Sequence, residues 1–144
     1  MAVRDILSHD EQLCEQRGVR LTPQRKQVLR IIMQSEFPLG AYEILQKMEQ
    51  PAAPPTVYRA LDFLLQQGLI HRLETLQAYL VCDHPDASHQ SQFLICSECG
   101  RVKEMEDRNI RRSLDSAASE AGFSRSNEVV EIIGRCGRCA GAGH

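Results

Sequence analysis

The stretch Thr56-Val-Tyr-Arg-Ala-Leu-Asp-Phe-Leu-Leu-Gln-Gln-Gly68 decides the fold of the first half of the chain. Its apolar residues recur at helical spacing, which predicts a helix over residues 57–67. Thr56 is suited to cap the start of this helix, and Gly68 is suited to end it. A hydroxyl, a phenol and a guanidinium then face outward near its first turn, from Thr56, Tyr58 and Arg59.

The segments on either side of this helix complete a recognisable pattern. Residues 69–74 and 78–82 read as two short strands of a hairpin. Upstream, apolar periodicity predicts three further helices: one that ends near Gly18, one that begins at Thr22-Pro23, and one from Ala41 to Met48. Several helices followed by a two-stranded hairpin are typical of a winged helix-turn-helix, in which one helix enters the major groove of DNA.

The second half of the chain has a different pattern. Strands are predicted over residues 92–96, 101–105 and 128–134, and a helix over residues 107–121. The apolar residues of this helix are expected to point inward: Ile110, Leu114, Ala117, Ala118 and Ala121. The chain is therefore predicted to be α+β, with a winged-helix domain at residues 1–83, a linker at 84–91 and a small α/β domain at 92–144.

Composition excludes several classes of protein. The 144 residues carry a formal net charge of -2, which argues against a basic histone-like binder and against a highly charged disordered chain. No signal peptide and no membrane span is recognisable, so we expect a soluble, cytoplasmic protein. One local imbalance stands out, because residues 17–30 hold five basic side chains and no acidic one. Such a segment is either a solvated helix face or a contact to phosphates.

Four of the six cysteines form two Cys-x-x-Cys pairs, Cys96 with Cys99 and Cys136 with Cys139. Two such pairs supply the four thiolates of a closed, tetrahedral structural zinc site. Residues 100–135 separate the pairs, more than the roughly 15–20 residues usual in zinc ribbons, so the intervening helix and strand must fold to bring them together. Redox-active or inert thiols are the alternatives, although neither pair opens a helix as a thioredoxin-type motif does.

A second, looser set of candidate ligands combines two nitrogens, a sulfur and an oxygen. Pairing about residues 75–77 places His71 opposite or diagonal to Cys82, while His89 lies in the linker and Glu104 on a later strand. Each residue alone is better explained as an ordinary surface or core side chain. Together they predict a regulatory metal site that draws on both halves of the chain, and a thiolate in the set favours zinc over harder ions.

The remaining candidates carry less. Cys14 is expected to pack in the core, and His84 is assigned no role. The sequence holds no nucleophile-base pairing, no phosphate-binding glycine loop and no His-Glu-x-x-His helix, which argues against an enzyme. A zinc-dependent enzyme or thiol oxidoreductase remains the alternative from another class.

Four motifs taken together resemble the ferric uptake regulator superfamily over roughly residues 10–140, and within it most of all the zinc uptake regulators. These are Arg20-Leu-Thr-Pro-Gln-Arg25, Ala41-Tyr-Glu-Ile-Leu45, Pro55-Thr-Val-Tyr-Arg-Ala-Leu61 and the two cysteine pairs. The resemblance implies an N-terminal DNA-binding domain and a C-terminal dimerisation domain that contains the structural zinc. It also implies a regulatory zinc at the hinge, so that each protomer holds two ions.

The resemblance further implies a zinc-responsive repressor that binds near-palindromic operator DNA as a metal-loaded homodimer and controls zinc uptake genes. The regulatory ligands of zinc-responsive relatives fall on the four residues already assembled: His71, Cys82, His89 and Glu104. Tyr42 and Arg59 match positions that reach the DNA. Thr56, Tyr58 and the basic cluster with Arg20 and Arg25 match positions near its backbone.

An iron-, manganese- or peroxide-responsive regulator is the alternative within the same superfamily. Iron-sensing relatives carry a histidine-rich motif across the hinge. Here only His84 and His89 stand in that region, which favours zinc.

Overall fold

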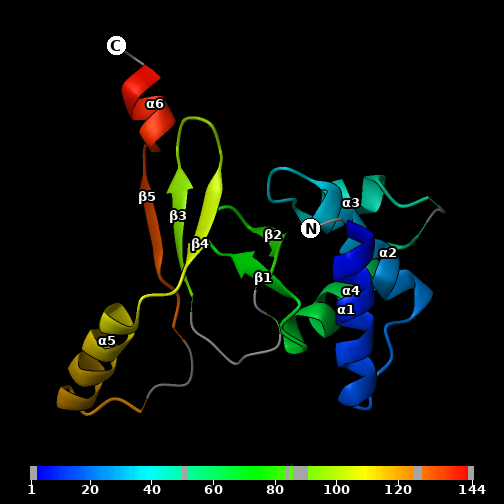
Figure 1. The fold of residues 1–144 in the computed structure, drawn as a ribbon, viewed down its shortest axis with the longest axis horizontal. Coiled ribbons are helices and arrows are strands. Elements are labelled where there is room, and N and C mark those ends of the chain that lie inside the picture. Colours follow the sequence, from blue (N-terminus) through cyan, green and yellow to red (C-terminus); the bar gives the residue numbers. More distant parts are fainter. Residues whose placement is uncertain (1–2, 50–51, 84, 86–90, 125–127, 143–144) are drawn as a thin grey trace. The chain divides into compact units, whose positions relative to one another are not determined.

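A computed structural model describes residues 3–49, 52–83, 85, 91–124 and 128–142, and the chain divides into two compact units, Met1–Ser88 and His89–His144 (Figure 1). The first unit contains α1 (Val3–Gln16), α2 (Pro23–Gln34), α3 (Ala41–Gln46), α4 (Pro54–Gln66), β1 (Ile70–Leu73) and β2 (Ala78–Val81). The second contains β3 (Gln92–Cys96), β4 (Val102–Met105), α5 (Arg108–Glu120), β5 (Glu131–Gly134) and α6 (Gly137–Ala142). This is the predicted α+β class.

Local capping explains where the first two helices stop and start. Helix α1 ends at Gln16, just before Gly18, whose φ of 74° is a left-handed conformation that favours glycine. Helix α2 begins as predicted, because the Thr22 hydroxyl accepts a hydrogen bond from the Arg25 backbone N–H and Pro23 occupies the first turn.

The predicted start of α4 was wrong. The helix begins at Pro54, with Ala53 as its N-cap, so Thr56 lies inside the first turn and does not cap it. The physical reason is that the first helical residues need no N–H donor, so both prolines of the Pro54-Pro55 pair fit there. The C-terminal prediction is confirmed: Gly68 has a φ of 72°, and the Leu69 N–H returns to the Leu64 carbonyl at 3.0 Å.

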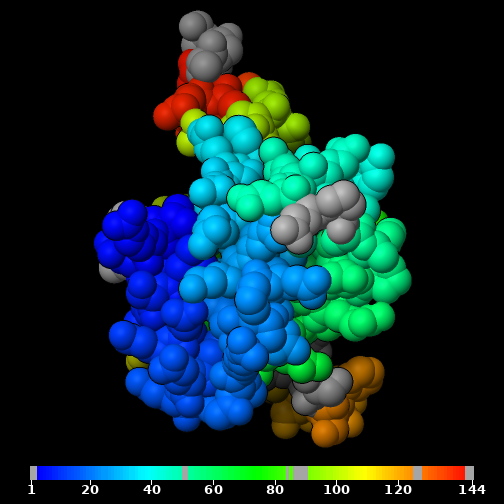
Figure 2. Space-filling view, turned by 90° about the vertical axis from the view of Figure 1, so that its right-hand side faces the viewer, coloured from blue at the N-terminus to red at the C-terminus, as the bar shows by residue number. Residues whose placement is uncertain are grey.

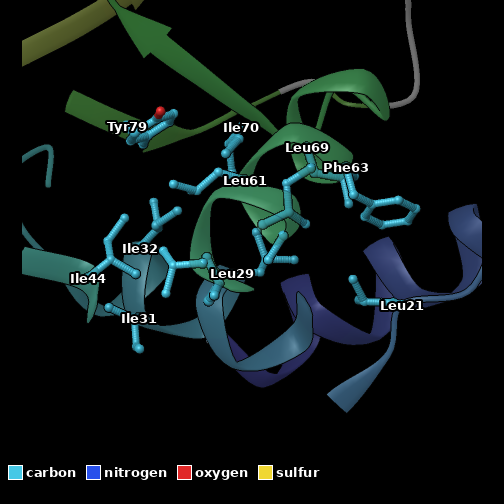
Figure 3. Packing of buried hydrophobic residues seen from close by; sticks show 14 of the residues in the cluster. Leu21, Leu29, Ile31, Ile32, Ile44, Leu61, Phe63, Leu69, Ile70 and Tyr79 are labelled. Carbon is cyan, nitrogen blue, oxygen red and sulfur yellow. The ribbon is translucent and has the colours of Figure 1, made fainter. Parts of the chain in front are cut away.

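The core of the first unit lies between α2, α4 and the β1–β2 hairpin (Figure 3). Leu29, Ile44, Leu61 and Leu64 are fully buried there. Helices α1 and α2, dark and lighter blue in Figure 2, lie side by side on one face of this unit. Cys14 of α1 is also fully buried, which confirms its predicted packing role, and burial raises the pKa of its thiol.

The predicted hairpin is confirmed, with β1 and β2 antiparallel and Ile70 paired with Val81. A third segment joins its edge, because Leu39 and Tyr79 exchange backbone hydrogen bonds of 3.0 and 2.8 Å. This contact ties the loop between α2 and α3 to the hairpin and so fixes the orientation of β2 on the helices.

The second unit is built on a three-stranded sheet in the order β4-β3-β5, in which β3 pairs antiparallel with β4 and parallel with β5. The last strand is shorter than predicted, since it begins at Glu131. Helix α6 was not predicted because Gly137 and Gly141 obscure any helical pattern.

The inward side predicted for the long helix of the second unit was also wrong for the single chain. No residue of α5 is buried, and Leu114 remains 38% exposed. Figure 1 shows α5 beyond the end of the sheet and not across its face. Asp107 caps the helix, with its carboxylate accepting from the Asn109 N–H at 2.8 Å. Among the described residues no helix is both long enough and apolar enough to cross a membrane.

Candidate metal centres

The parallel pairing of β3 with β5 brings the two cysteine pairs together, as the sequence required. Cys96, the last residue of β3, lies opposite Gly134, the last residue of β5, and Cys136 follows two positions later. The Ser97 N–H donates to the Gly134 carbonyl at 2.7 Å just beyond the strands. The long interval between the pairs is therefore closed by a sheet.

The four cysteine sulfurs lie within 4.8 Å of one another, and Cys99 Sγ is 3.8 Å from Cys136 Sγ. A zinc ion bound to four thiolates at about 2.3 Å requires sulfurs about 3.8 Å apart along each tetrahedral edge. The arrangement of Cys96, Cys99, Cys136 and Cys139 therefore fits a tetrahedral zinc ion in size and in donor type.

Backbone amides prepare two of these sulfurs for a cation. Cys96 Sγ accepts hydrogen bonds from the N–H groups of Cys99 and Cys136, at 3.5 and 3.4 Å, which lowers the pKa of its thiol to about 6. The Cys139 N–H likewise lowers the pKa of Cys136. Hydrogen bonds with the Cys136 and Cys96 sulfurs raise the pKa of Cys139 to about 12. Without a cation the Cys139 thiol therefore retains its proton at neutral pH, and metal binding would release it.

Arg135 connects the two cysteine pairs, and the sequence analysis missed it. Its Nε lies 2.7 Å from a Glu98 carboxylate oxygen in the first pair, and its Nη2 donates to the Cys139 carbonyl of the second at 3.0 Å. Both charged side chains are about half exposed, so their ion pair contributes little to stability. The signal in the sequence that could have predicted this ion pair is the placement of opposite charges within and beside the two cysteine pairs.

Two of the looser ligand candidates lie close together in the first unit. His71 pairs with Leu80 across the hairpin, so Cys82 lies diagonal to His71, which is one of the two predicted positions. Their ligand atoms are within 4.8 Å of each other. Cys82 is buried, and its N–H donates to the Leu69 carbonyl at 2.9 Å. A nitrogen and a sulfur donor are therefore held together by the hairpin.

The other two candidates belong to the remainder of the chain. Glu104 lies on β4 opposite Phe93, and its carboxylate accepts a hydrogen bond from the Ser91 hydroxyl. His89 and His84 lie outside the described residues.

The predicted DNA-facing residues of the helices are largely accessible. Tyr58 on α4 is 53% exposed and Tyr42 on α3 is 70% exposed. Arg59 is also exposed, whereas Thr56 is half-buried. A phenol and a guanidinium therefore stand together near the start of α4.

Some of the basic side chains at residues 17–30 make contacts within the first unit. Lys26 Nζ forms an ion pair of 2.8 Å with Glu11. The Arg25 guanidinium stacks 3.8 Å from the centre of the Phe63 ring and donates to the Arg20 carbonyl at 2.8 Å. Arg25 is thus placed against α4 by contacts that the sequence alone did not reveal, while the side chain of Arg20 is exposed.

The known proteins and structures that resemble this chain include regulators of one family. Residues 16–133 match the sequence profile of the ferric uptake regulator family. The zinc uptake regulation protein of Escherichia coli (strain K12) is 40% identical over 142 residues, which cover 94% of this chain and 82% of that protein. A zinc uptake regulator complexed with zinc and DNA has a TM-score of 0.94 at 38% identity, covering 99% of this chain and 98% of that one. A crystal structure of holo XcZur has a TM-score of 0.91 at 42% identity, covering 97% and 99%.

Proposed function

The chain belongs to the ferric uptake regulator family, and from that membership we propose that it is a zinc-responsive transcriptional repressor, which binds operator DNA as a metal-loaded homodimer and controls genes of zinc uptake and homeostasis. The observation that carries this proposal is the similarity over nearly the whole chain to zinc uptake regulators, one of them complexed with zinc and DNA. An iron-, manganese- or peroxide-responsive regulator is less well supported, because a thiolate donor set favours zinc.

Two zinc ions per protomer are proposed. The structural ion is held by Cys96, Cys99, Cys136 and Cys139, whose sulfurs lie within 4.8 Å of one another. The regulatory ion is assigned to His71, Cys82, His89 and Glu104. The proximity of His71 and Cys82 supports this assignment, while His89 and Glu104 are assigned from the sequence pattern.

The proposed control of DNA binding follows from linkage. An ion activates DNA binding only if it binds the DNA-competent state more tightly than the other state, and such couplings usually amount to about 1–3 kcal/mol. Two of the proposed donors lie in or beside the hairpin directly after α4, which is the helix proposed to enter the major groove of DNA. Ligation therefore restrains the segment that follows this DNA-reading helix. A twofold dimer of such helices reads half-sites about 34 Å apart, one turn of DNA.

The residues proposed to contact DNA carry polar donors on α3 and α4 or at and just before the start of α2. They are Arg20, Arg25, Tyr42, Thr56, Tyr58 and Arg59. Arg59 is the best of these residues for a direct test of DNA contact, because a guanidinium can donate two hydrogen bonds to a guanine edge.

Arg59→Ala is expected to weaken operator binding by about 5- to 150-fold, the range that corresponds to the loss of one bidentate base contact of about 1–3 kcal/mol. Fluorescence anisotropy with a duplex selected by the zinc-loaded wild type measures this loss. Arg112→Ala, which removes an exposed arginine from α5, is the control and is expected to bind almost as the wild type does. Equal affinities for the two variants would remove Arg59 from the reading surface.

The second unit is proposed as the dimerisation domain at residues 92–144, with the DNA-binding domain at 1–83 and the linker at 84–91. Its support is that the single chain leaves five large apolar side chains of this unit exposed: Leu114, Phe123, Val129, Ile132 and Ile133. Ile132 and Ile133 are successive residues of β5, so they point to opposite faces of the sheet and both are about half exposed. We infer that a second copy of the chain covers these side chains, because exposed apolar side chains that gather on a surface mark interaction sites.

Leu114→Asp is expected to shift the dimer toward monomer, because a buried, unpaired carboxylate would replace an apolar contact. Sedimentation equilibrium should show a dimer dissociation constant raised by at least about tenfold, since a 1.4 kcal/mol loss already gives that factor. Ser116→Asp, on the same helix, adds the same charge at a position outside the apolar stripe. A Leu114 variant as dimeric as the Ser116 variant would place the interface elsewhere.

Two further statements follow from the family. The chain is a transcription regulator and not an enzyme, and a closed four-thiolate site leaves no open position on its metal for a substrate. We also propose a cytoplasmic location, since the DNA partner requires one.

A further inference from the structure

One arginine joins three separate segments of the first unit. Arg17 follows the last residue of α1, and its Nη1 donates to the carbonyl of Gln67 at the end of α4. Its Nη2 donates to the carbonyl of Pro85, beyond the hairpin, at 2.9 Å. The two acceptors are 50 and 68 residues away from Arg17 in the sequence. A planar guanidinium can hold two carbonyls at once, which a lysine cannot do with the same geometry.

The Gln67 carbonyl is one that the end of α4 leaves without a helical partner. The N–H of Gly68 returns to Leu65, and the N–H of Leu69 returns to Leu64, both at 3.0 Å. The Gln67 carbonyl lies outside these two bonds, and Arg17 satisfies it. The positive charge of the guanidinium also suits the negative end of the helix dipole.

The Pro85 carbonyl lies three residues after Cys82, the proposed sulfur ligand. Cys82 itself is tied to the short segment between α4 and β1, because its N–H donates to the Leu69 carbonyl at 2.9 Å. Cys82 and Pro85 are therefore each connected to residues at or just after the end of α4. Cys82 is connected through this backbone bond, and Pro85 through the side chain of Arg17.

We propose that Arg17 is a positioning residue that couples the regulatory metal site to the DNA-reading helix. This inference rests on the proposed zinc response and adds the residue that transmits it. The Arg17 side chain is exposed and donates to the carbonyls of two residues that are neither proposed ligands nor proposed DNA contacts, so we expect its loss to leave the fold and each site in place. What changes is how firmly ligation at Cys82 restrains α4.

The test compares Arg17→Gln with Arg4→Gln, which removes the same charge from an exposed position of the same helix. For each full-length protein, anisotropy gives the affinity for a duplex selected by the zinc-loaded wild type, first with the regulatory zinc present and then after mild chelation. The ratio of the two affinities is the coupling. Because couplings in regulated proteins usually span about 5- to 150-fold, we expect Arg17→Gln to reduce the ratio by at least about threefold, and Arg4→Gln to leave it within about twofold.

Arg17→Lys distinguishes the two-carbonyl contact from the charge. This variant retains the charge, but its coupling ratio is expected to stay below that of the wild type, because a single ammonium does not reproduce the two hydrogen bonds of the guanidinium. By reciprocity, the enhancement of zinc affinity by DNA should fall by the same factor in each variant, which competition with a chromophoric chelator measures. Should Arg17→Gln fail to fold by circular dichroism, the Arg17→Lys ratio alone carries the test.

A coupling ratio for Arg17→Gln equal to that of the wild type would overturn the inference, even if both of its affinities fell together. That result would describe a merely structural residue. A ratio near one in the wild type would instead overturn the proposed zinc response, and the role of Arg17 with it. The two failures are thus separated by the behaviour of the wild-type protein.

Discussion

Cys96→Ser is expected to remove the structural zinc ion and to unfold much of the second unit. Cys96 Sγ accepts two backbone hydrogen bonds and lies at the point where β3 and β5 end together. A serine hydroxyl does not ionise at neutral pH, so the site would lose one of its four anionic ligands. Structural zinc contributes roughly 10–16 kcal/mol of apparent binding energy in zinc-finger peptides, so this loss should have the largest effect of any single substitution here.

Zinc analysis by mass spectrometry and thermal unfolding measure this effect. One zinc ion per protomer should disappear, the unfolding midpoint should fall steeply, and the dimer should weaken because its proposed interface lies in the same unit. Cys14→Ala is the matched control, because Cys14 is fully buried and lies in the first unit. It should cost about 1 kcal/mol of stability and leave the zinc content unchanged. Retention of both zinc ions by Cys96→Ser would contradict the four-cysteine assignment.

Cys82→Ser is expected to remove the zinc response while it leaves the fold and the structural zinc intact. Cys82 supplies the only proposed thiolate of the regulatory site, and the ligand atom of His71 lies within 4.8 Å of its sulfur. The backbone bond from the Cys82 N–H to Leu69 does not depend on the sulfur, so the hairpin should persist. Operator affinity should therefore stay at the chelated level, whatever zinc is added.

Anisotropy titrations with and without added zinc test this expectation, and Cys14→Ala again serves as the control for loss of a buried thiol. The wild type and Cys14→Ala should respond to zinc by the same factor, within the about 5- to 150-fold range typical of allosteric coupling. A Cys82→Ser protein with full zinc-dependent DNA binding would place the regulatory site on other residues.

The elements that the sequence predicted well are those fixed by local signals. Gly68 ends α4 through a left-handed residue, and Thr22 caps α2 through its own hydroxyl. The prediction that Thr56 caps α4 also relied on a local signal, but it was wrong because two prolines could begin the helix ahead of this residue. The prediction that Leu114 is buried within the single chain was wrong for another reason. An apolar stripe shows that a face needs cover, but it does not show whether the same chain or a second copy provides that cover.

The candidate sites follow the same division. The Cys-x-x-Cys spacing is local, so the four cysteines could be proposed as one zinc site before the sheet that joins them was known. The proximity of His71 and Cys82 followed from the hairpin register. By contrast, the contacts of Arg17 with Gln67 and Pro85, and the stacking of Arg25, join residues far apart in sequence. No spacing rule predicts such contacts, because they depend on how the helices pack.

The most direct measurement of the central claim is the number of zinc ions per protomer, determined together with operator binding before and after mild chelation. The account predicts two ions in the wild-type dimer, of which one is removed easily. DNA binding should be lost with that ion and should return when zinc is restored. A single tightly held ion per protomer, with DNA binding unchanged by the chelator, would contradict the zinc-responsive mechanism.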